Sequence, residues 1–128
     1  MFEMITPPES AGLTKYGLSK AAWTGRFLMT AAMALDVAKL KRHEDADTLH
    51  NETLICLESL DGFLSDRGLG RSDIVKITAY ISATDYFEEV LAAIRSFFAP
   101  YQAPVICPVA AGLAGGCRVE LDIVAAGR

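Results

Sequence analysis

Cys107 is the residue of this sequence that most directly suggests chemistry. It stands in the apolar stretch APVICPV, between Ile106 and Pro108. A nucleophilic thiolate needs a nearby base or a positive neighbour, and neither histidine lies near Cys107 in the sequence. We therefore interpret Cys107 as the wall of a site, where backbone N–H groups can bind a substrate oxygen, rather than as a covalent nucleophile.

The remaining cysteines and histidines favour structural roles. Cys56, Cys107 and Cys117 are odd in number and have no metal-type spacing, and His43 and His50 lie in or beside a polar stretch. We expect no metal site, core packing for Cys56 and Cys117, and a solvated face for the histidines. With no export signal at the N-terminus, the three thiols predict a reduced, cytoplasmic setting.

Glu120 is the candidate catalytic carboxylate. Residues 117–125 alternate between apolar and polar side chains with a period of two, which is typical of a strand with one buried face. The polar set is Arg118, Glu120 and Asp122. From this pattern alone, Glu120 is either an exposed acid on a polar strand face or a group in a site.

The elements that must position these residues follow from periodicity and turn signals. A hairpin turning at Thr24-Gly25, an amphipathic helix ending at Gly68, and a second helix opened by an Asp85/Glu88 capping box and ended by Pro100 stand out. The expected strands are 16–23, 26–35, 74–82, 105–110 and 117–125, with helices at 46–67 and 85–99.

This order, β-β-α-β-α-β-β, predicts a single α+β domain over residues 1–128. One sheet with both helices on one face is the economical packing. The other face must still be covered, and 52% of the residues are hydrophobic. We therefore expect copies of the chain to associate around their sheets in a closed ring.

Charge and hydropathy exclude several classes of protein. The net charge is −4, and there is no basic face for a phosphate backbone, so no nucleic-acid partner is expected. No apolar run reaches the length of a membrane span, so no membrane partner is expected either.

The stretch GLGRSDIVKITAYISATDYFEEVLAAIRSFF and the ending CRVELDIVAAG resemble the Rid family, also called the YjgF or L-PSP family. The resemblance runs from about residue 48 to the C-terminus and is weaker over residues 14–36. There TAAM stands where the family usually has Ser-Gly-Gln.

The resemblance implies a chorismate-mutase-like subunit in a homotrimer whose sheets form a central barrel. It further implies clefts between subunits that bind a small-molecule ligand, hydrolysis of reactive imines or enamines to a carbonyl compound and ammonia, and no metal or organic cofactor.

The resemblance also suggests site residues and shows one departure. Glu120 matches the family's water-positioning glutamate, Tyr16 an aromatic that closes the cleft, and Cys107 a cysteine of the cleft wall. The arginine that usually grips a substrate carboxylate is replaced by Val105, or by Ile106 if the gap is placed differently. Such a bidentate contact contributes about 1.5–3 kcal/mol, so the change disfavours an α-imino-acid substrate.

Three readings of the departure stay open. The ligand is less acidic and more apolar; or Lys15, Arg26 or Arg118 supplies the charge; or the pocket performs no hydrolysis. The sequence is therefore compatible with two functions. One is that of a divergent deaminase, and the other is that of a non-catalytic trimer that binds a small molecule or a partner. A ribonuclease, suggested only by an older family label, is disfavoured by the acidic net charge.

Overall fold

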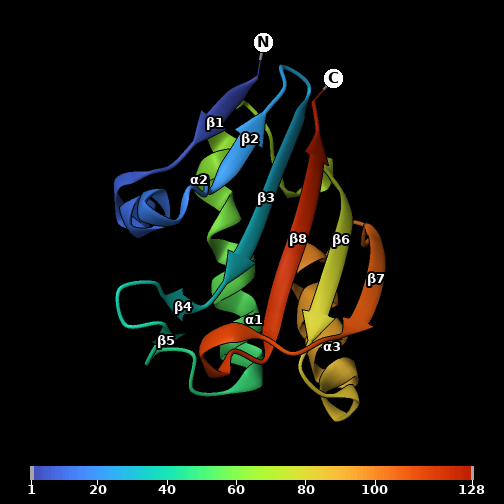
Figure 1. Cartoon of the computed structure of the whole chain (residues 1–128). Helices are drawn as coiled ribbons and strands as arrows, with labels where there is room; N and C mark the ends of the chain where they lie inside the picture. The colour runs from blue at the N-terminus through green and yellow to red at the C-terminus, as the bar shows by residue number, and fades with distance from the viewer. Residues whose placement is uncertain (1, 128) are drawn as a thin grey trace.

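A computed structural model describes residues 2–127, and its centre is a six-stranded sheet (Figure 1). In spatial order its strands are β1 (Glu3–Ile5), β2 (Ala21–Trp23), β3 (Phe27–Met33), β8 (Val119–Ala126), β6 (Ile74–Ile81) and β7 (Val105–Ala110). All neighbouring strands are antiparallel except β6 and β7, which are parallel. β7 lies at one edge of the sheet and β1 at the other.

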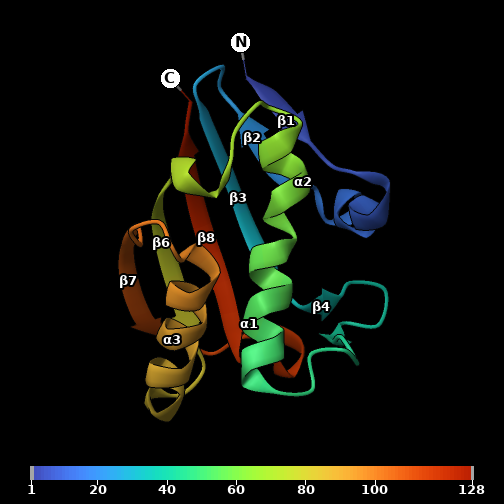
Figure 2. The ribbon, with the colours of Figure 1, turned by 180° about the vertical axis from the view of Figure 1, so that it is seen from behind.

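The helices α1 (Leu49–Glu58), α2 (Leu60–Ser65) and α3 (Phe87–Phe98) cover one face of the sheet (Figure 2). This confirms the α+β class and the packing of helices on a single face. The helix expected at 46–67 begins at Leu49 and divides at Ser59, whose hydroxyl donates to the carbonyl of Cys56 at 2.7 Å. The connection from β3 to α1 contains a short two-stranded ribbon. In it, β4 (Leu35–Asp36) pairs with β5 (Lys41–Arg42).

The predicted strand at 16–23 is too long, and Tyr16 is not part of it. Tyr16 ends a 3-10 helix, η1 (Pro8–Tyr16), which starts at a proline and stops at Gly17 with a left-handed φ of 73°. The strand itself begins at Ala21. The turn to β3 is present, with Gly25 at a φ of 92°, and Thr24 N–H donates to the carbonyl of Phe27 at 3.0 Å.

The starts of β6 and α3 differ from what the sequence predicts. A bulge between Ile74 and Lys76 turns Ile74 into the core and leaves Val75 43% exposed, so strict alternation fails at the start of β6. The Asp85/Glu88 capping box is absent, because a 3-10 turn, η3 (Thr84–Tyr86), leads directly into α3 and makes Tyr86 the residue before the helix.

A buried carboxylate ties α1 to the beginning of β8. Glu52 is fully buried on α1 and accepts hydrogen bonds from the backbone N–H of Arg118 at 2.7 Å and from that of Val119 at 3.3 Å. Its other oxygen accepts Nε of the Arg118 guanidinium at 2.7 Å. The same guanidinium donates to the carbonyl of Ala46 at 3.0 Å. This cluster fixes where β8 begins, at Val119, one residue before Glu120.

We expect Glu52→Ala to lower the free energy of unfolding by about 3–5 kcal/mol, because it breaks a buried ion pair and leaves two backbone donors without a partner. The matched control is Glu58→Ala, an exposed acid on the same helix, which we expect to change stability by no more than about 0.5 kcal/mol. Urea unfolding followed by Trp23 fluorescence measures both. Equal effects of the two substitutions would refute the structural role of Glu52.

Candidate functional site

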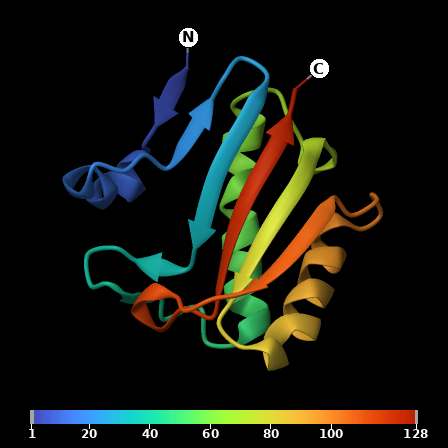
Figure 3. The same ribbon diagram turned by 45° about the vertical axis from the view of Figure 1, so that its right-hand side comes forward.

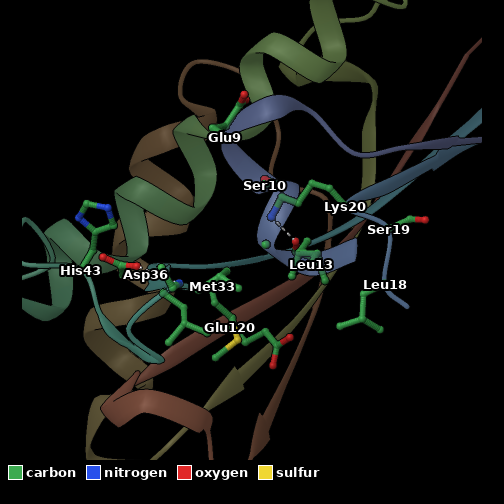
Figure 4. A pocket seen from close by; sticks show the side chains of 15 residues that line it. Glu9, Ser10, Leu13, Leu18, Ser19, Lys20, Met33, Asp36, His43 and Glu120 are labelled. Atoms are coloured by element: carbon green, nitrogen blue, oxygen red, sulfur yellow. Dashed lines mark hydrogen bonds between the residues drawn. The ribbon is translucent and has the colours of Figure 1, made fainter. Parts of the chain in front are cut away.

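A cavity of about 650 Å³ lies beside the open face of the sheet, near the end of β3. Figure 4 shows its side chains, which come from η1, the segment before β2, β3, the β4–β5 ribbon and β8. Its walls are mostly apolar, and its ionisable residues are Glu9, Lys20, Asp36, His43 and Glu120. Of the residues predicted from the sequence to form the site, only Glu120 lines this cavity.

Two segments far from β8 in the sequence form the outer wall. Gly12 of η1 approaches the β4–β5 connection so closely that a Cβ there would meet Cγ1 of Val37 at 3.1 Å. The carboxylate of Asp36 accepts N–H groups from Ala38 at 3.1 Å and Lys39 at 3.2 Å, which shapes the turn. Asp36 is therefore occupied by its own loop, and Glu120 and Lys20 are the ionisable groups placed on the main sheet or directly before it.

Glu120 reaches the cavity from the middle of the sheet. Its neighbours across the strands are Met33 on β3 and Tyr80 on β6. It alternates with Val119 and Leu121, which are buried in the core, and therefore lies on the opposite face of the sheet. Burial raises the pKa of the Glu120 carboxyl above its ordinary value of 4.5, the charge of Asp122 raises it further, and Lys20 opposes the shift. A half-buried carboxyl with a raised pKa is suited to proton transfer.

Lys20 is the functional candidate that the sequence analysis missed. Its backbone N–H donates to the carbonyl of Ile5 at 2.9 Å, and its carbonyl accepts the hydroxyl of Thr30 at 2.8 Å. The amine Nζ donates to the carbonyl of Ala31 at 2.6 Å. Burial lowers the pKa of the Lys20 amine from 10.5, more than the charges of Cys56 and Glu120 raise it. An isolated lysine one residue before a short strand carries no sequence signal of this environment.

The other predicted site residues lie elsewhere in the chain. Cys107 and Val105 are exposed on β7, the edge strand that Figure 3 shows beside β6. Their register with β6, and that of β6 with β8, places them on the same face of the sheet as Glu120. Ile106 points the other way and packs against the core. Of the two positions considered for the missing arginine, Val105 is therefore the one that shares a face with Cys107. Tyr16 is 50% exposed on η1.

None of the three cations expected to replace the arginine lines the cavity. Arg118, directly before β8, is bound to Glu52 of α1. Arg26 lies over the ring of Phe27 in the β2–β3 turn, and Lys15 lies over Tyr16. Lys20 is the cation that the structure places there instead.

The remaining thiols are packed in the core. Burial, assisted by the charge of Glu52, raises the pKa of Cys56 to about 12. Burial also raises the pKa of Cys117. Both shifts suppress the thiolate, in keeping with the packing roles predicted for these residues. Within residues 2–127, no three His, Cys, Asp or Glu side chains group in a way that could hold a metal ion, and no helix is both long and apolar enough to cross a membrane.

The sheet order and the helices on one face define an α+β subunit of the YjgF type, which solved structures share. A Rid-family protein of unknown function from Yersinia pestis superposes with a TM-score of 0.82 at 20% identity, over 98% of this chain and 99% of that one. The YjgF gene product of Escherichia coli gives 0.81 at 19% identity, over 98% and 99%. A YjgF/YER057c/UK114 family member from Mycobacterium tuberculosis gives 0.77 at 21% identity, again over 98% and 99%. At such identities these likenesses show the fold alone.

The family itself is shown by the sequence. The model of the family described as endoribonuclease L-PSP matches residues 11–127, nearly the whole chain. The chain therefore belongs to the L-PSP family, also known as the YjgF or Rid family. No curated protein matches it.

The raised pKa of Glu120 has a measurable consequence for stability. A carboxyl whose pKa is higher in the folded than in the unfolded state destabilises the fold once the pH rises above the unfolded-state pKa, near 4.5. We expect Glu120→Gln to raise the free energy of unfolding at pH 7 relative to the native chain, and to have a smaller effect at pH 4. Chemical unfolding at the two pH values measures this. A substitution that destabilises more at pH 7 than at pH 4 would show the opposite shift.

Proposed function

We propose that the protein hydrolyses a small imine or enamine to a carbonyl compound and ammonia, with Glu120 as the group that orients and activates water. The observation that carries the proposal is the position of Glu120: a half-buried carboxyl with a raised pKa, in a cavity large enough for a small metabolite. Family membership supports the same class of reaction.

The reaction needs only groups that this cavity can supply. Ionised Glu120 accepts a proton from water while the water oxygen bonds to the carbon of the C=N group. The protonated carboxyl then delivers that proton to the nitrogen, which gives a carbinolamine. Glu120 next takes the proton of the carbinolamine hydroxyl as the carbonyl forms and passes it to the nitrogen, so that the carbon–nitrogen bond breaks and ammonia leaves. Glu120 ends as it began. A pKa raised towards the working pH favours both halves of this transfer.

The proposed working site lies between copies of the chain. Cys107 lies on β7, two strands from Glu120, a lateral separation of roughly 10 Å. It does not line the Glu120 cavity of its own chain. The open face of the sheet carries exposed apolar side chains, including Met29 on β3 and Val105 on β7, which are 43% and 66% exposed. We propose that a homotrimer covers this face and brings Cys107 of one copy towards Glu120 of the next.

The proposed substrate is not strongly anionic. Within residues 2–127 no arginine lines the cavity, and three carboxylates line it against a single lysine. A second negative charge on the ligand would meet net repulsion in a partly dehydrated space, where uncompensated charge is costly. We therefore favour a neutral or amine-bearing imine with an apolar substituent, which the leucine, methionine and valine walls fit.

A non-catalytic role is the alternative, in which the trimer binds an apolar small molecule without turnover. The largely apolar walls of the cavity support binding as much as reaction. A ribonuclease activity, which the name of the family suggests, is disfavoured by the net charge of −4, because phosphate-backbone binding needs a basic face.

We expect the native protein to release ammonia from imines generated freshly in solution, faster than the uncatalysed reaction. Glu120→Gln should lower the catalysed rate by roughly 10²–10⁴-fold, because proton transfer by the carboxylate is lost. Coupled detection of ammonia measures both rates, with neutral and carboxylate-bearing imines compared.

The matched control is Asp122→Asn, an exposed acid two residues along the same strand that does not line the cavity. It should remain active near neutral pH. Because Asp122 raises the pKa of Glu120, its removal should also shift the acidic limb of the pH–rate profile to lower pH. Equal loss in both variants, or none in Glu120→Gln, would contradict the assigned role.

We expect multi-angle light scattering to give three times the chain mass of 13.8 kDa. Met29→Glu places a charge in the exposed apolar sheet face and should shift the mass towards one chain, whereas Glu58→Gln on the helix-covered side should not. A native protein that is monomeric at all concentrations would rule out a cleft between copies.

A further inference from the structure

Among residues 2–127, Lys20 is the only lysine or arginine that lines the cavity. It sits immediately before β2, with both of its backbone hydrogen-bonding groups engaged, to Ile5 and to Thr30. Its side chain is half-buried and its Nζ is anchored to the carbonyl of Ala31. The amine is therefore held in a defined place rather than free in solvent, as Figure 4 shows.

We propose that Lys20 is an amine nucleophile that captures the carbon of a small carbonyl or imine compound as a Schiff base. Three features of the geometry support this: Lys20 lines the cavity with its Nζ held at the carbonyl of Ala31, apolar residues such as Leu13 and Met33 line the same cavity, and Glu120 lines it as a proton donor and acceptor. The proposal deepens the proposed function and rests on it for the class of substrate.

The environment of Lys20 suits this chemistry better than simple charge pairing. A lysine attacks carbon only as the neutral amine, and burial increases the neutral fraction by lowering the pKa of Lys20. Each unit of such lowering raises that fraction about tenfold at neutral pH. A lysine that served only to bind anions would need to remain charged. An anion in this cavity would also be repelled by the carboxylates, which outnumber Lys20 there.

The covalent route balances without an oxidant or another reactant. The lone pair of the Lys20 amine forms a bond to the carbon of the substrate C=N group, and the substrate nitrogen takes up a proton. That nitrogen leaves as ammonia, which yields an imine between Lys20 and the former substrate carbon. Water then adds to this imine, the carbonyl product leaves, and the free amine is restored. Glu120 carries the protons in both halves, and the sum is imine plus water giving carbonyl plus ammonia.

The test uses acetone as a small neutral carbonyl probe and cyanoborohydride as the trapping reductant, on the native assembled protein. Reduction of the Schiff base leaves an isopropyl group on the lysine, which peptide mass spectrometry locates. We expect Lys20 to be modified first near neutral pH, and faster than Lys39, an exposed lysine on the neighbouring turn that does not line the cavity. Lys20→Met should abolish the fast modification, and Lys39→Met should leave it unchanged.

The pH dependence separates a reactive amine from one that is merely accessible. The rate at Lys20 should rise with pH at a lower midpoint than the rate at Lys39. In Glu120→Gln the midpoint should move lower still, because the Glu120 charge raises the pKa of Lys20. Modification of Lys20 no faster than that of Lys39, or an identical midpoint for the two lysines, would overturn the proposal.

The outcome is independent of whether the protein is a deaminase. If ammonia release survives in Lys20→Met while no adduct forms in the native protein, the covalent route is wrong and direct hydrolysis stands. If the adduct forms rapidly at Lys20 but no imine yields ammonia, Lys20 is an amine nucleophile and the proposed hydrolysis is wrong.

Discussion

The buried pair of Glu52 and Arg118 is the constraint on which the rest of this structure depends. A carboxylate with no exposed surface persists inside a core only when its oxygens are paired, and Glu52 has two backbone donors and a guanidinium as partners. Through these contacts the helix layer sets the point at which β8 enters the sheet. Glu120 is the second residue of β8, so the same contacts set its position along the strand and its place on the open face. A second anchor lies on β3, where the buried hydroxyl of Thr30 donates to the backbone carbonyl of Lys20.

The two faces of β8 thus differ in role, because one packs against the helices and the other carries the candidate site. The helix-covered face is packed with fully buried residues such as Val119 and Leu121, and its one charged cluster is closed on itself. The other face carries Glu120 and Asp122 on a surface that remains partly apolar and open. Burial of Glu120 is incomplete, which raises its pKa without fixing it in the neutral form. The cost to stability of this shift is consistent with a group retained for chemistry rather than for packing.

The sequence predicts the fold well because its signals are periodic. Alternation over 117–125 and the apolar stripes of the helices identify β8, α1 and α3 and the face each one buries. The errors fall where a local rule is overridden: the bulge that exposes Val75, and the proline-initiated 3-10 helix that removes Tyr16 from a strand. The site is predicted only at Glu120. Lys20 is identified as a site residue only from the structure, where η1, β3 and β8 line a cavity around it. In the sequence Glu52 cannot be told from a surface glutamate, because its burial depends on the packing of α1 against the start of β8.

We propose that a small ligand occupies the cavity between Lys20 and Glu120 and is enclosed by a neighbouring copy of the chain. A crystal structure of the assembled protein with a small ketone product tests this most directly. The account predicts ligand density within hydrogen-bonding distance of the Glu120 carboxylate, beside Nζ of Lys20, with Cys107 of an adjacent copy completing the wall. Density for the ligand at another site, or a subunit interface that fills this cavity with side chains, would contradict it.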